Sequence, residues 1–478
     1  MHVHITGICG TAMAALAGML RDAGHRVTGS DANFYPPMST FLTGLQIPVV
    51  RGYQAGNLVP RPDVVVTGNV VRRDNPEAVA AREAGLEILS LPQAIQRFFL
   101  TDRLSVVAAG THGKTTLTSM TAWILLDAGL EPSYLVGGIP LNTGSNYRVG
   151  AGRHFVIEGD EYDTAYFDKQ PKFLHYRPHV AAITSVEFDH ADIYRDLDHV
   201  KDAFRRFAAL LPPEGALAVS SACPGAQEVA RTAACPVRLY GTRGDEEWVG
   251  AGMTWRPGAT AFRVLRRLPS GRLRPVAEVV LPLTGLHNVQ NALAALVLAR
   301  ECGVPLARAA EALGRFRGVM KRQQVLGEVR GIRVVDDFAH HPTAVRVTLA
   351  GLAAGYRPSR LLAAYHFESN TSRRRVFQDA YVDALALADR VYLSTPLVKS
   401  DSLAADEYLD PHLVSRRLRA RGIAARVFPD VETMAAAIVE DAAPGDLVVG
   451  MSGRDFDGLH QKVLALLEGE EFRQLWLA

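Results

Sequence analysis

Residues 108–119 read AAGTHGKTTLTS, in which a lysine and a threonine directly follow a glycine. The strict phosphate-loop pattern G-x-x-x-x-G-K-[ST] needs its first glycine at the start of this stretch, where the chain has alanine. The physical requirements are still met, because Gly110 and Gly113 allow a tight turn whose N–H groups point inward. Lys114 would reach the β- and γ-phosphates of ATP, and the Thr115 hydroxyl would be available to Mg²⁺. The alternative is a surface turn that precedes a helix and binds no nucleotide.

Two acidic segments follow predicted strands farther along the chain. They read EGDEYD at residues 158–163 and EFDH at residues 187–190. Because the carboxyl ends of parallel strands share one edge of a sheet, we expect Glu158 and His190 to meet near the Thr115 hydroxyl. Mg²⁺ prefers oxygen ligands, so a histidine would be a less usual partner for it. Each acid taken alone is equally compatible with a solvated loop carboxylate.

The N-terminal segment GICGTAM, residues 7–13, also joins a predicted strand to a predicted helix. Asp31 follows the next strand, where a dinucleotide site keeps the acid that binds ribose. This pattern favours a nicotinamide-dependent oxidoreductase as one interpretation. The spacing is G-x-x-G rather than G-x-G-x-x-G, however, so the turn suits the diphosphate of a sugar nucleotide as well. A tight turn without any ligand is the third interpretation.

Two further segments carry side chains suited to a nucleotide. GLHNVQNALAA places Asn288 and Asn291 three positions apart on one helical face, where amides suit the edge of adenine. Helix capping is the alternative role for Asn288. VVDDFAHHPTA ends a predicted strand with two acids and two histidines, a cluster that fits ribose binding, metal binding or proton transfer. His340 and His341 are equally compatible with a structural pair ahead of a proline.

These segments must be held by alternating strands and helices, and hydrophobic periodicity predicts three such blocks. The first has strands at residues 2–6, 27–30 and 63–67, helices at 11–23 and 78–84, and a connector at 89–103. The second has strands at residues 104–108, 154–158 and 180–185, helices at 115–128 and 288–300, and antiparallel strands within 248–283. The third begins near residue 330 and has strands at residues 332–336, 360–364, 390–393 and 446–450. The alternation predicts an α/β protein with parallel sheets and domains at residues 1–100, 101–318 and 319–478.

Composition narrows the classes of protein. The chain has 478 residues, enough for about three domains of ~150 residues each. With 52 basic and 50 acidic residues its formal charge is +2, which gives no support to a nucleic-acid or membrane-surface partner. The four cysteines form no C-x-x-C pair, so reduced thiols in a cytoplasmic protein are expected. The N-terminal residues lack the features of a signal peptide, and no apolar run of about 18 residues occurs, so no membrane span is expected.

Taken together, these motifs resemble those of the Mur ligases, the ATP-dependent enzymes that build the peptide of bacterial cell-wall precursors. The resemblance covers nearly the whole chain in the family's order. It matches GTHGKTT to the ATP loop, EGDEYD to the metal-binding acids, EFDH to the metal histidine, GLHNVQNALAA to the adenine helix and DDFAHHP to the start of the third domain. GICGTAM and the GSD of residues 29–31 resemble the UDP-binding first domain of the muramate–alanine ligase branch, which favours UDP-N-acetylmuramate over NAD.

The resemblance implies a Rossmann-like UDP-binding domain, a central P-loop ATPase domain and a Rossmann-like C-terminal domain that binds the peptide. It also implies a role for each matched residue. The expected catalytic residues are Lys114, Glu158, His190 and Arg322, and the expected Mg²⁺ ligands are Thr115, Glu158 and His190. The expected ATP-binding residues are Gly110, Thr111, His112, Gly113, Lys114, Thr115, Thr116, Asn288, Asn291, Arg322 and Asp337. The expected UDP-sugar contacts are Gly7, Gly10, Thr11, Ser30, Asp31 and Asn69.

Several segments, among them SDANFYPPMST, EYDTAYFDKQPKFLHYRP and EFDHADIY, are most similar to the branch that recycles cell-wall peptides. That likeness implies ligation of L-alanyl-γ-D-glutamyl-meso-diaminopimelate, a murein tripeptide, to UDP-N-acetylmuramate through an acyl phosphate. The sister branch, which adds L-alanine, typically has DESD where this chain has DEYD and remains the alternative. A non-catalytic nucleotide switch is a further alternative. Arg205 stands where several superfamily members have a carbamylated lysine, which is consistent with the muramate–alanine branch. SNTSRRR and SGRDFDGLHQK also resemble the recycling branch, although the arginines of the first and the charges of the second depart from the family pattern.

Overall fold

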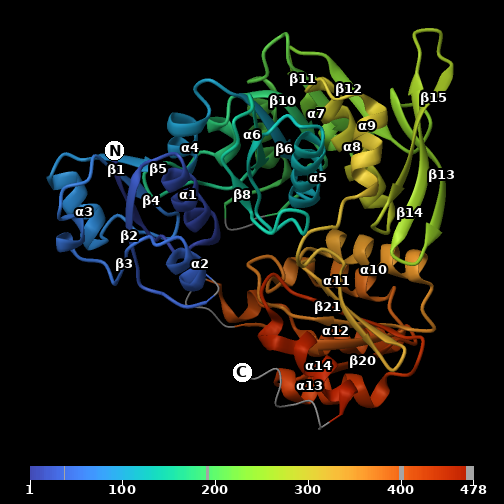
Figure 1. The fold of residues 1–478 in the computed structure, drawn as a ribbon. Coiled ribbons are helices and arrows are strands. Elements are labelled where there is room, and N and C mark those ends of the chain that lie inside the picture. Colours follow the sequence, from blue (N-terminus) through green and yellow to red (C-terminus); the bar gives the residue numbers. More distant parts are fainter. Residues whose placement is uncertain (37, 190–192, 398–402, 470–478) are drawn as a thin grey trace.

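The computed structural model describes residues 1–36, 38–189, 193–397 and 403–469 (Figure 1). Within these ranges the chain forms three sheets that follow one another in sequence order, each flanked by helices. In Figure 1 the first sheet lies at the left in blue, the second sheet at the top in blue-green to yellow, and the third sheet at the bottom in orange to red. No helix of the described part of the chain combines the length and apolarity needed to cross a membrane.

The first sheet is parallel, with strand order β3-β2-β1-β4-β5. Its strands are β1 (His2–Thr6), β2 (Arg26–Asp31), β3 (Val49–Arg51), β4 (Val64–Thr67) and β5 (Glu87–Ser90). The helices are α1 (Thr11–Asp22), α2 (Met38–Gly44), α3 (Pro76–Glu83) and α4 (Leu91–Phe99), with a 3₁₀ turn at Ala55–Leu58. Strand β4 is buried at every position, as expected for a parallel strand covered on both faces.

The expected connector at residues 89–103 is wrong, because most of it belongs to β5 and α4. Helix α4 begins with a capping box: the Ser90 side chain accepts from the Gln93 N–H, and the Gln93 side chain accepts from the Ser90 N–H. Pro92 lies in the first turn, where a backbone N–H has no helical partner to lose. The proline therefore starts this helix instead of breaking it.

The second sheet has ten strands in the order β15-β14-β13-β12-β11-β10-β6-β9-β7-β8. Its strands are β6 (Leu104–Ala109), β7 (Ser133–Leu135), β8 (Tyr147–Arg148), β9 (His154–Gly159), β10 (Pro178–Ile183), β11 (Ala216–Ser220), β12 (Val237–Gly241), β13 (Trp248–Arg256), β14 (Ala259–Arg267) and β15 (Leu273–Leu281). Its helices are α5 (Lys114–Asp127), α6 (Leu197–Ala208), α7 (Pro224–Ala230), α8 (Leu286–Glu301) and α9 (Leu306–Gly314), with a 3₁₀ turn at Lys172–His175. Strands β13 to β15 pair antiparallel, which confirms the prediction for residues 248–283.

The third sheet has the order β16-β17-β21-β18-β19-β20, and only β16 runs antiparallel to its neighbour. Its strands are β16 (Gln324–Val329), β17 (Ile332–Asp337), β18 (Leu361–Tyr365), β19 (Arg390–Ser394), β20 (Ala424–Phe428) and β21 (Leu447–Met451). Its helices are α10 (Pro342–Tyr356), α11 (Gln378–Leu385), α12 (Pro411–Ala420), α13 (Val431–Asp441) and α14 (Leu459–Glu468), with 3₁₀ turns at Arg375–Phe377, Ala405–Glu407 and Phe456–Gly458. Strands β16 and β20 were not predicted from the sequence, and β16 begins this sheet before residue 330.

Three α/β sheets, parallel for the most part, confirm the predicted fold class. The domain limits at residues 100 and 318 stay a prediction. The first limit lies between α4 and β6, and the second lies between α9 and β16. Helix α10 of the third sheet lies against β13 and α8 of the second, so the two halves enclose space near the phosphate loop.

Candidate active site

The glycine-rich turn joins β6, a central strand of the second sheet, to helix α5. Gly110 and Gly113 have φ values of +131° and +83°, in the region that favours glycine. A Cβ on Gly113 would lie 2.6 Å from the Asn291 Oδ1 atom, so a larger residue would also collide with helix α8. The turn therefore keeps the backbone close to α8 and aims the first N–H groups of α5 at the space in front.

Lys114 is the first residue of α5 and is held by two oxygen atoms. Its Nζ donates to the Gly110 carbonyl at 2.8 Å and to the Glu161 Oε2 atom at 2.7 Å. Burial alone would lower the pKa of Lys114, but the nearby carboxylates of Glu161 and Asp160 outweigh burial and raise it. The side chain is therefore a fixed cation beside the turn. Glu161 had no individual role among the residues predicted from the sequence, although it lies in the EGDEYD segment.

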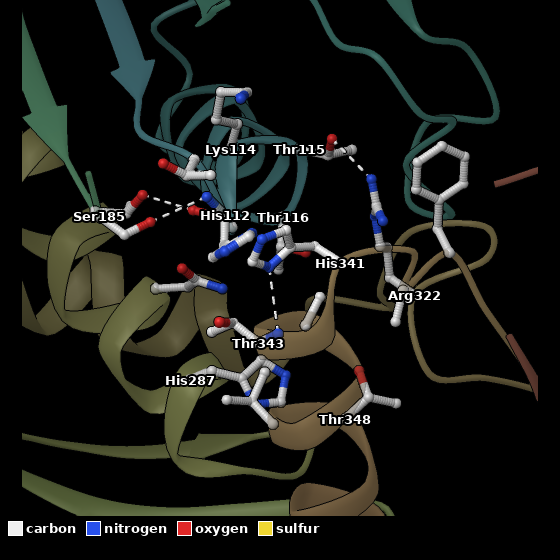
Figure 2. A pocket seen from close by; sticks show the side chains of 18 of the residues that line it. His112, Lys114, Thr115, Thr116, Ser185, His287, Arg322, His341, Thr343 and Thr348 are labelled. Carbon is white, nitrogen blue, oxygen red and sulfur yellow. Dashed lines mark hydrogen bonds between the residues drawn. The ribbon is translucent and has the colours of Figure 1, made fainter. Parts of the chain in front are cut away.

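Thr115 and Glu158 form an oxygen pair next to this cation. The Thr115 hydroxyl donates to the Glu158 Oε2 atom at 3.2 Å, and the Gly137 N–H donates to the Glu158 Oε1 atom at 2.5 Å. Arg322 approaches from the other side of the cavity, and its Nη2 donates to the Thr115 Oγ1 atom at 3.1 Å (Figure 2). A hydroxyl and a carboxylate are hard oxygen donors, so these residues fit Mg²⁺. The third predicted ligand, His190, lies outside the described residues.

Burial and charge set the protonation of the acids near this pair. Burial raises the pKa of Glu158, and the neighbouring Asp160 carboxylate raises it further. Burial would also raise the pKa of Asp160, but Lys172 and Lys114 outweigh it and lower this pKa. The surroundings therefore favour the protonated form of Glu158 and the charged form of Asp160, although the two acids are only two residues apart.

A cavity of about 610 Å³ opens in front of the turn, and both the second and the third sheet contribute to its walls. The Asn288 side-chain amide donates to the Thr284 carbonyl at 2.8 Å and to the Gln323 Oε1 atom at 3.3 Å. Three buried nitrogen atoms in the cavity wall have no hydrogen-bond partner among the described residues, namely Nδ1 of His287, Nε2 of Gln323 and Nε2 of His341. Buried polar atoms of this kind are normally satisfied, so the wall is suited to a polar ligand.

Asn288 does not cap helix α8, because the N-cap residue of this helix is Gly285. Asn291 and Thr116 also line the cavity. The Asp337 carboxylate lines it too, but its oxygens accept from the Gln323 and Ala339 N–H groups, both at 2.8 Å. Asp337 therefore holds the segment between the second and third sheets, and its predicted place near a ribose stays a prediction.

Thr111 and His112 tie the turn to the strand end that follows β10. The Thr111 Oγ1 atom accepts from the Glu187 N–H at 2.9 Å, and the His112 N–H donates to the Ser185 hydroxyl at 3.0 Å. His112 Nε2 lies 3.2 Å from the Glu187 Oε2 atom. Burial would raise the pKa of Glu187, but hydrogen bonds from His112 and Thr343 and the charge of His112 lower it to about 2.

His341 completes a cluster that the sequence analysis did not assemble. Among the described residues, His112, Glu187 and His341 offer nitrogen and oxygen atoms within 4.8 Å of one another. The rings of His112 and His341 have centroids 4.7 Å apart, although the residues lie on different sheets' loops (Figure 2). In the sequence, these residues could be recognised only as following predicted strands. That position does not indicate that the ends of those strands meet in the fold.

The N-terminal glycine turn is a separate feature of the first sheet. The Gly7 N–H donates to the Ser30 carbonyl at 2.8 Å, and the Asp31 Oδ2 atom accepts from the Cys9 N–H at 2.8 Å. Gly10 and Thr11 are exposed at the start of α1. Asp31 therefore braces the turn, and the exposed N-terminus of α1 is the part open to a diphosphate.

Ser30 and Asn69 lie differently from one another. Ser30 is fully buried, and its hydroxyl donates to the Glu77 Oε2 atom at 2.6 Å, so the side chain supports the sheet from inside. Asn69 is exposed, and its Nδ2 donates to the Asp163 Oδ1 atom of the second sheet's loops at 3.2 Å. Asn69 thus links the first and second sheets, and both residues' contacts with a UDP-sugar stay predictions.

The fold and the site define a three-part α/β enzyme with a phosphate loop in its central sheet and a cavity closed by its third sheet. Family models of known proteins match all three parts. "Mur ligase family, catalytic domain" matches residues 2–103, "Mur ligase middle domain" residues 108–299, and "Mur ligase, glutamate ligase domain" residues 321–454. The chain belongs to the Mur ligase family and is a ligase.

Individual relatives cover nearly the whole chain. The Escherichia coli (strain K12) UDP-N-acetylmuramate–L-alanyl-γ-D-glutamyl-meso-2,6-diaminoheptandioate ligase is 39% identical over 472 residues, 97% of this chain and 98% of that protein. A UDP-N-acetylmuramate–L-alanine ligase of Cupriavidus taiwanensis is 35% identical over 485 residues, 97% of this chain and 98% of that protein. The crystal structure of a murein peptide ligase from Psychrobacter arcticus superimposes with a TM-score of 0.72 at 34% identity, covering 98% and 99% of the two chains.

Proposed function

We propose that this ligase joins L-alanyl-γ-D-glutamyl-meso-diaminopimelate to UDP-N-acetylmuramate with cleavage of ATP. The observation that carries the proposal is the 39% identity, over nearly the full length of both chains, to an Escherichia coli ligase named for this reaction. The Haemophilus influenzae ligase of the same name is 37% identical over 470 residues, and it supports the same acceptor. The geometry adds a phosphate loop that faces a two-sided cavity.

ATP would supply the γ-phosphoryl group that converts the lactyl carboxylate into an acyl phosphate, with ADP as the leaving group. The peptide's α-amine would then attack the acyl carbon, lose a proton and displace phosphate to form the amide. Lys114 binds the phosphate oxygens and neutralises charge that develops on them. Thr115 and Glu158, together with His190, would hold Mg²⁺, which would neutralise phosphate charge, and Arg322 brings a further cation to the Thr115 hydroxyl from the segment before β16. Asn288 and Asn291 hold the adenine. Gly7, Gly10, Thr11, Ser30, Asp31 and Asn69 would form the UDP-sugar site, with the Ser30 and Asp31 side chains holding the strand and the glycine turn in place.

Exclusion of water is the remaining task of the protein, since water would hydrolyse an acyl phosphate. Arg322 and Phe338 would support this task, because both line the cavity and the guanidinium of Arg322 lies 4.4 Å from the Phe338 ring centroid. We place the reaction in the cytoplasm, where nucleotides are available. The four cysteines, all free thiols, are consistent with that compartment.

An acceptor panel tests the proposal. Purified protein, ATP, Mg²⁺ and UDP-N-acetylmuramate are combined with the tripeptide or with L-alanine, and ADP release and the UDP-linked product are measured. We expect turnover with the tripeptide that depends on every component. Preferred use of L-alanine would instead establish the alternative acceptor, which the 35% identity to an alanine ligase supports. Absence of turnover with both acceptors contradicts the proposal.

A further inference from the structure

His341 carries a buried proton that no described residue accepts. The residue immediately precedes α10, and its Nδ1 atom accepts the Thr343 N–H at 3.2 Å, as a helix-capping side chain does. In a neutral imidazole one ring nitrogen accepts and the other carries the hydrogen. Because Nδ1 accepts, Nε2 is the N–H donor of His341.

This donor is enclosed at the wall of the cavity. His341 is 6% exposed, and its Nε2 atom has no hydrogen-bond partner in the described part of the chain. The ring lies against His112 of the phosphate loop and, edge to face, against Phe377 at 5.4 Å between centroids. A buried donor without an acceptor loses the hydrogen bond it made to water, so such a group calls for a partner in the working state.

The two carboxylates nearest to His341, Glu187 and Asp189, already accept hydrogen bonds from Thr343 and Thr371. The Glu187 Oε2 atom lies 3.2 Å from His112 Nε2 and accepts from the Thr343 hydroxyl at 2.8 Å. Burial, with a smaller contribution from the neighbouring His112 ring, lowers the pKa of His341 to about 4. His341 is therefore a neutral donor at neutral pH and carries no cation that would need a carboxylate.

We propose that the His341 Nε2–H group donates a hydrogen bond to an anionic oxygen of the bound reactants where the third domain meets the phosphate loop. This inference rests on the proposed function, and it adds a donor that the motif assignments left out. The shared chemistry is a phosphoryl or carboxyl oxygen. Two sources supply it, the nucleotide and the sugar acid, and the experiment below separates them.

A metal ion is the competing occupant, since two imidazoles and a carboxylate within 4.8 Å form a recognisable ligand set. Coordination through His341 Nε2 would require a free lone pair on that atom. The Thr343 N–H donates to the Nδ1 atom of His341, so the lone pair of the neutral ring lies on Nδ1 and faces the backbone. The hydrogen is then on Nε2 and faces the cavity. The geometry therefore favours a donor over a ligand.

Two substitutions separate the two nitrogens of this side chain. His341→Asn retains a good helix-capping acceptor and lacks the Nε2 donor. His341→Gln offers an amide N–H that reaches toward the position of Nε2 and lacks the short capping acceptor. His412→Asn is the matched control, because His412 is an exposed histidine in the first turn of α12 in the same domain. Steady-state ligation, thermal unfolding and calorimetric titrations with ATP and with UDP-N-acetylmuramate are measured for each protein.

For His341→Asn we expect wild-type thermal stability and a fall in kcat of about 100-fold, the usual loss of one aimed donor. His341→Gln should lose stability and keep more of the rate, and His412→Asn should match the wild type. Weakened ATP binding in His341→Asn identifies the nucleotide oxygen as the acceptor. Weakened UDP-N-acetylmuramate binding identifies the carboxyl oxygen of the sugar acid. A loss confined to kcat shows that the hydrogen bond forms only in the transition state of phosphoryl transfer.

The opposite pattern overturns the inference. If His341→Asn ligates at the wild-type rate and His341→Gln does not, the residue acts only as a helix cap. Zn²⁺ that raises the unfolding temperature of the wild type and leaves that of His341→Asn unchanged would establish a metal site in place of a donor. Failure of the wild type itself to ligate any acceptor would contradict the proposed function, a result distinguishable from both.

Discussion

Lys114 keeps its charge in a nearly enclosed place because two acids lie beside it. Its side chain is 12% exposed and makes its shortest contact with Glu161, which is 3% exposed. A lysine in such a place without the acids would be easier to deprotonate. The Lys114 side chain is therefore both shielded from solvent and permanently charged, which suits the stabilisation of charge during phosphoryl transfer.

Replacing Lys114 with methionine tests this residue. The substitution keeps most of the volume, removes the charge and leaves Glu161 without its closest cation. We expect the ligation rate to fall at least about 100-fold, because charge on the phosphoryl oxygens is then unneutralised. ADP release in the presence of both substrates measures the effect.

The control is Lys462→Met, since Lys462 lies on α14 and contacts Glu432 near the surface. It should ligate at the wild-type rate. A Lys114→Met protein that remains folded and synthesises the amide at full speed would contradict the role given to the phosphate loop.

At the scale of elements, Glu77 in the first turn of α3 ties the first sheet together. The side chain is fully buried, and its Oε2 atom accepts from Ser30 of β2 at 2.6 Å and from Thr6 of β1 at 2.8 Å. Asn57 donates to the other oxygen at 2.5 Å. Burial would raise the pKa of Glu77, but hydrogen bonds from His4, Ser30 and these neighbours outweigh it and lower the pKa.

The lowered pKa predicts how the stability of this domain depends on pH. A carboxyl whose folded pKa lies below its unfolded value stabilises the fold above the unfolded pKa of about 4.5, and this contribution is lost as the pH falls through the folded pKa. We expect Glu77→Gln to lower the free energy of unfolding by about 1–3 kcal/mol at neutral pH, since one donor must then face an amide N–H. The deficit should narrow toward acid pH.

Urea unfolding of the two proteins at neutral and acid pH measures the deficit. Glu83→Gln is the control, because Glu83 is exposed at the other end of the same helix. A constant deficit across the pH range would show that the buried charge of Glu77 does not provide this stability.

At the scale of the whole molecule, direct hydrogen bonds join the second and third domains around the cavity. Thr343 donates to Glu187 at 2.8 Å, and Thr371 donates to Asp189 at 2.5 Å. Both donors come from the third domain, and both acceptors follow β10 of the second. The cavity is therefore complete only while the two domains are in contact.

We predict that nucleotide and UDP-sugar together shift the protein toward this closed arrangement, because ligands that touch both domains favour it. Small-angle X-ray scattering should show a smaller radius of gyration after an ATP analogue and UDP-N-acetylmuramate are added. Thr371→Val, which lacks one of the joining hydrogen bonds, should compact less.

Thr433→Val serves as the control, because the Thr433 hydroxyl bonds only within the cap of α13 in the described structure. It should compact as the wild type does. An unchanged radius of gyration in the wild type on addition of both ligands would contradict ligand-driven closure.

The sequence by itself determined the features that depend on neighbouring residues. Alternating strands and helices follow from local hydrophobic periodicity, and the phosphate turn follows from glycines beside a lysine and a threonine. Residues 89–103 were missed because Pro92 was interpreted as a loop residue, although a capping box with a proline in the first turn is a signal for a helix start. Strand β16 was missed because it is an edge strand without a buried residue, so its sequence lacks a strong hydrophobic pattern.

Only the tertiary structure decided which distant side chains meet. His112 and Glu187 are 75 residues apart, and Thr343 is 156 residues beyond Glu187, yet all three share one network. The order of strands in a sheet and the closure of one domain on another set these meetings, and neither leaves a periodic trace in the sequence. The direction of the His341 proton was decided in the same way, because it depends on a backbone N–H that only the folded helix presents.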